Sequence, residues 1–242
     1  MKQGRGKNIA LGLGAAIAIA AGTLFLQQSP PPKEPAAPPI TAPATATFHG
    51  LTPAGIAGDP ILNAQKNRWT PPVAVKDITI NEVFSFAHEA LERAGERDRE
   101  KWDASALAQA KQYESMGVRI EGYILDAKKS GLESSNGKND SLRDFHLWVA
   151  TSPDAPKQER MVVEPIPFYL EKHPEWSLAN IRKAIKDKAK VRLSGWILWD
   201  EEHSEEVGKS RGTLWEIHPV TKIEIMENNS WVDLHDLVQN LP

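Results

Sequence analysis

Residues 118–125 read VRIEGYIL, and residues 191–198 read VRLSGWIL. The two stretches agree at five of eight positions. Both show an alternation with a period of two, which is typical of a half-buried β-strand. Gly122 and Gly195 occupy the same place in each stretch, and a glycine inside a strand marks a sharp bend or a close approach of another backbone. The pair therefore predicts two strands that coil at matching points.

Three more strands and a helix are expected around this pair. The segment DFHLWVA places Phe145, Leu147 and Val149 on one face, as in a strand. Ser177 is a good N-cap for a helix with an apolar stripe, and the last strand is expected to bend at Pro219. The predicted strands are residues 118–125, 144–150, 161–164, 191–198 and 213–225, and the predicted helix is residues 178–189.

The order of these elements is strand, strand, strand, helix, strand, strand. Over residues 118–225 it resembles the OB-fold, a five-stranded Greek-key barrel. The resemblance implies an OB-like barrel (β-β-β-α-β-β). Together with two preceding helices and an N-terminal membrane segment, which other parts of the sequence predict, the expected fold class is α+β, mostly β. An irregular α+β sandwich is the alternative.

Two segments carry a second resemblance. DFHLW (residues 144–148) and RGTLWEIHPVTKIEI (residues 211–225) are similar to segments of uncharacterised exported and membrane-anchored bacterial proteins. This resemblance implies membership of such a family and brings no known activity with it.

Residues 9–26 predict a transmembrane or signal segment. They form an uncharged, almost wholly apolar run behind a basic n-region, residues 1–8. As a helix the run spans roughly 27 Å, enough for the core of a bilayer. A positive end stays in the cytoplasm, so the body is expected on the other side. We expect an uncleaved single-pass anchor in a bacterial inner membrane, with the body in the periplasm or at the cell exterior. A cleaved signal peptide and a buried helix are the alternatives.

Between this segment and the barrel the sequence predicts a spacer and two helices. Residues 27–72 hold 11 of the 18 prolines, a composition that favours extended chain and cannot bury a core. Apolar residues recur at helical spacing from Asn81, a plausible N-cap, to Arg93, and residues 104–115 predict a second helix. The predicted divisions are residues 1–8, 9–26, 27–72 (linker), 73–117 (helical lead-in), 118–225 (barrel) and 226–242 (short C-terminal helix or tail).

Composition excludes several classes of function. There is no cysteine, which removes disulfides, thiol nucleophiles and thiolate zinc sites. The first 33 residues carry four bases and no acid, so residues 34–242 hold 25 bases against 32 acids. A general polyanion binder is basic, so nucleic acid is not an expected partner. No G-x-S-x-G elbow, P-loop or dinucleotide-binding glycine pattern occurs.

One face of the predicted barrel gathers aromatic and polar side chains. Strand alternation directs His146 and Trp148 outward, and it directs Tyr123 and Trp196 outward on other strands. OB-folds bind ligands on such a face, with aromatic rings as stacking platforms. The alternative is that the helices of residues 81–115 cover this face. The predicted ligand-binding residues are Tyr123, His146, Trp148, Trp196, Arg119 and Arg192.

Histidine and carboxylate side chains on the same strands predict a second kind of site. Without cysteine, the ligands of any metal are nitrogen or oxygen donors. Their spacing matches no known ligand signature such as H-E-x-x-H. The run DEEHSEE (residues 200–206) is interpreted as a solvated loop, with a weak cation site as the alternative. No cofactor other than a divalent metal is indicated. The candidate metal ligands are His146, Glu164, His203, Glu216 and His218, with Asp200 as a further suitable donor.

Two functions remain open from the sequence. The first is a membrane-tethered, extracytoplasmic binding module with an OB-like barrel and no catalysis, whose partner is a protein, a glycan or a small ligand. The second is a metal-assisted hydrolase built on the histidines and carboxylates. The hydrolase requires His146 and His218 to converge, whereas the module requires Tyr123, Trp148 and Trp196 to be exposed.

Overall fold

The computed structural model describes residues 46–234 of the chain. The predicted membrane segment, residues 9–26, and the first part of the predicted linker lie outside the described residues. Within residues 46–234, every helix is too short or too polar to cross a membrane.

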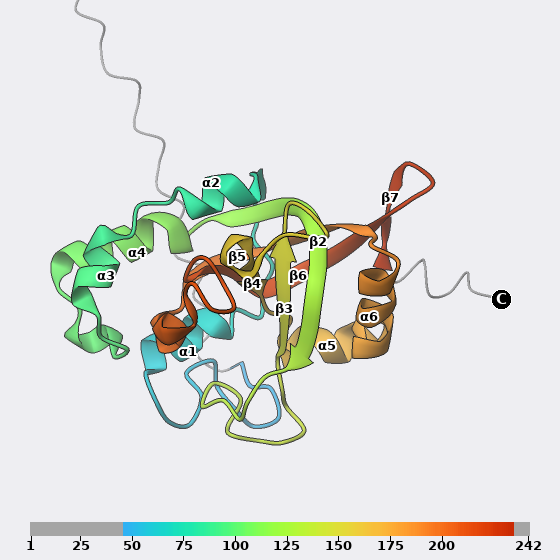
Figure 1. The fold of residues 1–242 in the computed structure, drawn as a ribbon. Coiled ribbons are helices and arrows are strands. Elements are labelled where there is room, and N and C mark those ends of the chain that lie inside the picture. The colour runs from blue at the N-terminus through green and yellow to red at the C-terminus, as the bar shows by residue number, and fades with distance from the viewer. Residues whose placement is uncertain (1–45, 235–242) are drawn as a thin grey trace, which may run out of the picture. The chain divides into compact units, whose positions relative to one another are not determined.

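Five strands form a closed barrel (Figure 1). The order around the barrel is β2-β3-β4-β6-β5, and β5 pairs again with β2. β4 and β6 are parallel, and the other neighbours in the barrel are antiparallel. Because this is a five-stranded Greek-key barrel with helices between its third and fourth strands, the predicted OB-like fold is confirmed. The strands are β2 (Gly117–Lys129), β3 (Phe145–Ala150), β4 (Met161–Val163), β5 (Lys190–Trp199) and β6 (Trp215–Glu227).

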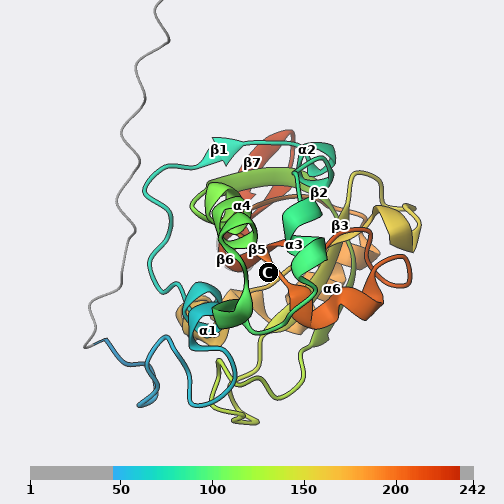
Figure 2. The ribbon, with the colours of Figure 1, turned by 90° about the vertical axis from the view of Figure 1, so that its left-hand side faces the viewer.

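Helices flank the barrel on two sides. In Figure 1, α2, α3 and α4 lie together on one side, and α5 and α6 lie on the other. Figure 2 looks onto the first side and shows α3 and α4 in front of the barrel. The helices are α1 (Pro60–Lys66), α2 (Ile80–Phe84), α3 (Glu89–Ala94), α4 (Ala104–Glu114), α5 (Pro167–Lys172) and α6 (Leu178–Lys186), and two short strands are β1 (Lys76–Asp77) and β7 (Ser230–Asp233).

The barrel interior is filled by apolar side chains that alternate along each strand. Ile120 of β2 and Leu147 of β3 are fully buried in one core, as the alternation predicts. At one end of the barrel, the ring of Tyr113 packs edge-on against Trp215, with 5.1 Å between ring centroids. α4 therefore packs against a core tryptophan, Trp215, whereas the alternative drawn from the sequence is that the helices of residues 81–115 cover the aromatic face.

Gly122 and Gly195 stand where other backbones approach closely. A Cβ added to Gly195 would lie 2.2 Å from the carbonyl oxygen of Pro219, and one added to Gly122 would lie 2.6 Å from that of Ala150. These separations are far below van der Waals contact, so a larger residue would displace a strand. The pairing of β5 with β6 is also irregular around Gly195. A close approach of another backbone is thus confirmed at both glycines, and an irregular strand pairing is found at Gly195.

The helix predicted from Asn81 to Arg93 is in fact two helices, α2 and α3. The N-cap of α2 is Thr79 and not Asn81, because the Thr79 hydroxyl accepts a hydrogen bond from the N–H of Glu82. The Glu82 carboxylate in turn accepts from the N–H of Thr79, which completes a capping box. The second predicted helix is confirmed as α4.

Part of the predicted linker is folded. α1 begins at Pro60 with Asp59 as its N-cap, a position where a helix tolerates proline. The guanidinium of Arg68 donates to the carbonyl oxygens of Ile197 and His218. These hydrogen bonds join the segment to β5 and β6, so its last residues belong to the barrel domain.

Part of the segment predicted as a short helix or tail, residues 226–242, forms a strand, and its residues 235–242 lie outside the described residues. Residues 230–233 form β7, which pairs with the end of β6. Asn228 and Asn229 make the connection, both with positive φ. Asparagine adopts this backbone conformation more readily than most residues, and it favours a two-residue hairpin turn.

Candidate metal centre

A cluster of buried charged side chains lies on the outer face of β3, β4 and β6. In β6, Trp215 and Ile217 belong to the core, so Glu216 and His218 face outward. The β2–β3 loop, the β5–β6 loop and α1 contribute the rest of the cluster. In OB-folds, the corresponding strands and loops bind ligands. This polar cluster consists of Lys66, Glu133, Asp144, His146, Glu164, Asp200, His203, Arg211, Glu216 and His218.

Glu133, His146 and Glu164 form the outer triad of the cluster. One potential ligand atom of each lies within 4.8 Å of the others. Nε2 of His146 is 3.0 Å from Oε1 of Glu164 and 4.0 Å from Oε1 of Glu133. The His146 and Glu164 side chains are almost fully buried, whereas Glu133 is 16% exposed. The outer triad therefore reaches the surface at Glu133.

Asp144, Glu164 and His218 form the inner triad. Nε2 of His218 is 3.6 Å from Oδ2 of Asp144, and its Nδ1 is 3.7 Å from Oε2 of Glu164. All three side chains are at most 3% exposed. The two triads share Glu164, so His146 and His218 lie on the same carboxylate but belong to different triads. The hydrolase hypothesis, which requires the two histidines to converge on one ion, stays a prediction.

Several buried atoms of the triads have no hydrogen-bond partner among the described residues. About nine in ten buried polar atoms in proteins are paired, and an unpaired one costs about 1–3 kcal/mol. Imidazole nitrogen and carboxylate oxygen are preferred ligands of zinc, manganese and iron, so these atoms fit a divalent cation. The unpaired atoms are Asp144 Oδ2, His146 Nδ1 and Nε2, Glu164 Oε2 and His218 Nε2.

Burial governs protonation in the two triads. It lowers the pKa of His146 to about 4 and that of His218 to about 3, so both imidazoles are neutral at pH 7 and keep a nitrogen lone pair. Burial and neighbouring acids raise the pKa of Asp144 and of Glu164 well above their ordinary values. A bound cation would favour the ionised carboxylates and offset this effect.

The positive charge of Arg211 offsets the negative charge of the acidic side chains beside the triads. Its buried guanidinium lies 3.2 Å from a carboxylate oxygen of Asp200 and 3.2 Å from one of Glu216. Burial alone would raise the pKa of Asp200, but the hydrogen bond from His203 and the charge of Lys66 hold it well below its ordinary value. The same hydrogen bond raises the pKa of His203 to about 9, and burial raises that of Glu216 to about 7. Asp200 and Glu216 are therefore tied to charged partners.

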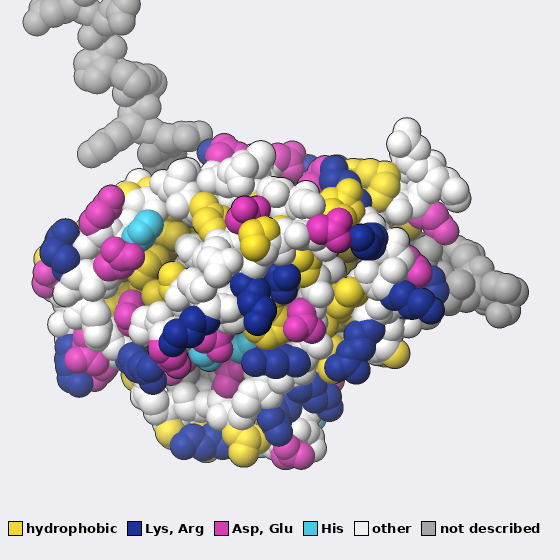
Figure 3. Space-filling view, in the orientation of Figure 1, with side chains coloured by type: hydrophobic (Ala, Val, Ile, Leu, Met, Phe, Trp, Pro, Cys, Tyr) yellow, Lys and Arg dark blue, Asp and Glu magenta, His cyan; other side chains and the backbone are white. Residues whose placement is uncertain are grey.

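A cavity of about 520 Å³ adjoins the outer triad. Figure 3 shows a hollow on this face with histidine and acidic side chains inside it and basic side chains along its edge. Nζ of Lys66 lies 2.7 Å from Oε2 of Glu202 and 3.7 Å from Oε2 of Glu133. Because Glu133 and His146 line the cavity, a small molecule that enters it can reach the outer triad. Its lining includes Lys66, Arg97, Glu133, Lys138, His146 and His203.

Three of the predicted metal ligands, His146, Glu164 and His218, meet in the triads. The other two predicted ligands, His203 and Glu216, lie beside the triads and contact neighbouring side chains. His203 binds Asp200, and Oε1 of Glu216 is 3.2 Å from Nδ1 of the His218 ring.

Glu133 and Asp144 are not among the metal ligands predicted from the sequence. Asp144 directly precedes a strand whose alternation directs it to the outer face, which was a usable signal. Glu133 lies in the β2–β3 loop, where no periodic pattern exists to mark it. Lys66 lies within the predicted linker and was missed for the same reason.

The predicted aromatic face is covered. Trp148 is 6% exposed and Trp196 is 7% exposed. The guanidinium of Arg68 lies over the Trp196 ring, and the ammonium of Lys128 lies over Trp148. Tyr123 is half-buried. The two tryptophans therefore lack the exposure that a stacking face requires, because neighbouring cationic side chains and the folded end of the linker lie against them.

Arg119 and Arg192 do not form a free basic patch. Nε of Arg119 is 2.5 Å from Asp77, and Nη2 of Arg192 is 2.7 Å from Glu121. The Arg192 guanidinium also lies over the ring of Trp231, 4.1 Å from its centroid. Both arginines are thus engaged by neighbouring side chains, and neither points to an anionic ligand.

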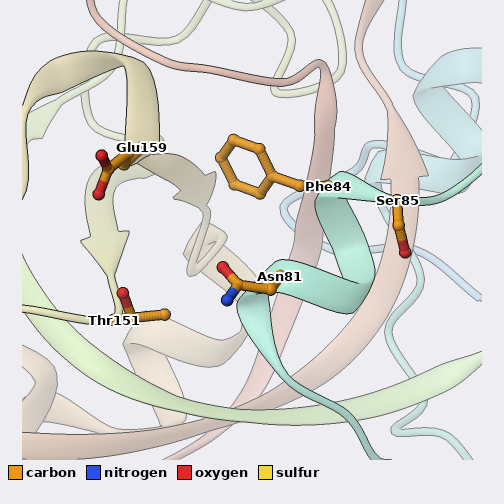
Figure 4. A pocket seen from close by; sticks show the side chains of 5 residues that line it. All are labelled: Asn81, Phe84, Ser85, Thr151 and Glu159. Carbon is orange, nitrogen blue, oxygen red and sulfur yellow. The ribbon is translucent and has the colours of Figure 1, made fainter.

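A second cavity, of about 350 Å³, lies between α2 and the chain around β3 and β4 (Figure 4). Glu159 is the one titratable side chain among the described residues that line it, and it is not joined there by a histidine. This cavity therefore lacks the donor set that the polar cluster provides. The lining residues are Asn81, Phe84, Ser85, Thr151 and Glu159.

No family model matches the sequence, and no curated protein is significantly similar to it. Among solved structures, a chain in the crystal structure of yeast Stn1 and Ten1 is similar, with a TM-score of 0.36 and 16% sequence identity. The match covers 66% of this chain and 66% of that chain. The assignment to the OB-fold rests on the strand order and the closed barrel. The expected similarity to exported bacterial proteins and the expectation about nucleic acid stay predictions.

Proposed function

We propose that this protein is an OB-fold binding module that holds a divalent transition-metal ion at the outer triad and, through that ion, an anionic group in the adjoining cavity. The observation that carries the proposal is His146, a buried imidazole with both nitrogens unpaired and Nε2 3.0 Å from the Glu164 carboxylate. OB barrels bind ligands on the face where His146 lies.

A cation at the outer triad would make the cavity favourable for an anionic ligand. Lys66, Arg97 and Lys138 line it. A cation at the outer triad adds positive charge, and oxygen anions readily occupy a further coordination position on such an ion. Three acids line the cavity as well: Glu133 and Glu202 lie close to Lys66, and Glu205 lies 3.3 Å from Nη2 of Arg97. These acids offset the charge of the three bases, so the bound cation supplies the positive charge that attracts the ligand. A phosphate or carboxylate group therefore fits this cavity best.

Measurement of bound metal tests the proposal directly. The full chain, purified without chelator, is expected to bind Mn²⁺ or Zn²⁺ in a calorimetric titration. His146→Ala is expected to weaken binding more than about 100-fold, because loss of an outer-shell partner alone costs 10–100-fold. His49→Ala is the matched control, since His49 is half-exposed and pairs with Glu171 away from the triads. Equal affinity in the His146 variant and the unchanged chain would overturn the proposal.

Hydrolysis on the bound ion is a second candidate function. The observation that favours it is that the outer triad supplies three ligands and adjoins a cavity. Catalytic zinc sites keep such an open position for water, whose pKa the metal lowers to about 7. The test is turnover of bis(4-nitrophenyl) phosphate with Mn²⁺. Turnover that persists after His146→Ala would exclude this site as its origin.

The membrane anchor and the extracytoplasmic location of the body are also part of the proposal. They are supported by the basic residues 1–8 and the uncharged run of residues 9–26. An alkaline phosphatase fusion to the C-terminus of the full chain is expected to be active and to sediment with membranes. A cytoplasmic, inactive fusion would contradict this location.

A further inference from the structure

We infer that the polar cluster holds a second divalent cation, in the inner triad, with Glu164 bridging the two ions. The inference rests on the proposed function, because the outer triad is taken as the first site. It assigns a ligand role to Asp144 and His218, which the cavity does not reach.

Glu164 is placed to bridge. Its Oε1 is 3.0 Å from Nε2 of His146, and its Oε2 is 3.7 Å from Nδ1 of His218. The two oxygens of one carboxylate thus face histidines that belong to different triads. Paired metal ions in proteins lie about 3.5–4 Å apart, a separation that one bridging carboxylate spans.

The inner donor atoms are spaced for a cation between them. A tetrahedral ion with bonds of 2.0–2.2 Å separates its ligand atoms by roughly 3.3–3.6 Å. Nε2 of His218 and Oδ2 of Asp144 are 3.6 Å apart, and neither has a hydrogen-bond partner. The pair is therefore too far apart for a direct hydrogen bond and close enough to share an ion.

One side-chain atom of His218 and one of Asp144 are each held by a neighbouring side chain. Nδ1 of His218 lies 3.2 Å from Oε1 of Glu216, which leaves Nε2 free. Nδ2 of Asn136 donates to Oδ1 of Asp144 at 2.7 Å, which leaves Oδ2 free. Outer-shell partners of this kind orient the ligands of metal sites. Each of these two residues therefore has one atom held by a neighbouring side chain, and the other atom, Nε2 of His218 or Oδ2 of Asp144, has no hydrogen-bond partner among the described residues.

The two sites differ in access. The inner triad is at most 3% exposed, whereas the outer triad adjoins the cavity through Glu133 and His146. Enclosed sites are typical of structural ions, and open sites are typical of ions that bind further ligands. We therefore assign the inner ion a positioning role: it holds Glu164 in place for the outer ion.

The experiment loads the full chain with Mn²⁺ and measures metal stoichiometry together with the electron paramagnetic resonance spectrum. Two ions per chain with an exchange-coupled spectrum are expected. Asp144→Asn is expected to reduce the stoichiometry to one ion and give an uncoupled spectrum. Asp140→Asn, an exposed acid of the same loop that pairs with Arg143, is the matched control and is expected to keep both ions.

The outcomes separate the two proposals. One ion in the unchanged chain, still bound after Asp144→Asn, would overturn the second site and leave the proposed function intact. No bound ion would overturn both proposals. Two ions without coupling would overturn the bridge. If Asp144→Asn does not fold, the stoichiometry and coupling of the unchanged chain still decide the question.

Discussion

At the scale of single residues, Glu164 occupies the most constrained position in the polar cluster. It directly follows β4, and its N–H donates to the carbonyl oxygen of Ile217 at 2.9 Å. Its own carbonyl oxygen accepts from the N–H of Val220 at 2.9 Å. These two hydrogen bonds clamp the Glu164 backbone against β6. The carboxylate is thereby held between the histidines of β3 and β6, whatever occupies the triads.

Glu164→Gln is predicted to separate metal binding from folding. Burial disfavours the ionised carboxylate, since it raises the pKa of Glu164 well above its ordinary value. A neutral amide of the same shape should therefore leave the free energy of unfolding unchanged or slightly raised in the presence of chelator. The unchanged chain should gain about 2.7 kcal/mol at a metal concentration of 100 Kd, and the variant should gain nothing.

Urea unfolding with Mn²⁺ and with chelator measures both quantities. The control is Glu159→Gln, which removes a carboxylate from the second cavity. A variant that is stabilised by metal as much as the unchanged chain would contradict the role given to Glu164.

At the scale of elements, the coiling of β5 depends on Gly195. Because Gly195 has no side chain, the carbonyl oxygen of Pro219 can lie 2.2 Å from the position that a Cβ would occupy. The contact is with backbone, so no side-chain rotation can relieve it. Closure of the barrel and the position of His218, one residue before Pro219, depend on the same approach.

Gly195→Ala is predicted to lower the free energy of unfolding by about 1–3 kcal/mol or more, the cost of an overpacked interior. It should also weaken metal binding, because β6 must shift where it carries His218. Gly131→Ala is the control, since a Cβ at Gly131 meets nothing within 4 Å. Chemical denaturation of both variants checks the result, and equal stability would show that the strands move apart easily.

At the scale of the whole molecule, a buried ion pair joins the helical lead-in to the barrel. The guanidinium of Arg99 donates two hydrogen bonds to Glu114 of α4, both at 2.7 Å, and a third to the carbonyl oxygen of Trp199 in β5. Glu114 also accepts from the N–H of Trp199. Removal of either charge would leave the other buried and unpaired.

Glu114→Gln is predicted to cost about 3–5 kcal/mol at pH 7, as expected for one partner of a buried pair. Burial alone would raise the pKa of Glu114, but the charges of Arg99 and Arg68 lower it below its ordinary value. The contribution of Glu114 to stability is therefore complete above about pH 4.5 and is lost as the pH falls through the lowered pKa.

Urea unfolding between pH 7 and pH 3 tests this prediction. The difference between the unchanged chain and Glu114→Gln should shrink as the pH falls. Glu100→Gln, an exposed position next to Arg99, should stay within about 0.5 kcal/mol of the unchanged chain. A difference that does not change with pH would mean that Glu114 acts by packing alone.

Local patterns in the sequence predict the barrel and three of the five side chains in the two triads. Strand alternation and the matching glycines are local patterns, and they set the order of elements and the outward direction of His146 and His218. That Glu133 and Lys66 lie with them, and that Trp148 and Trp196 are covered, follows from the tertiary structure. The physical reason is that periodicity records which face of an element is buried. The partner that buries the face is chosen by closure of the barrel and by loops, and these bring together residues that are far apart in the chain and share no local pattern.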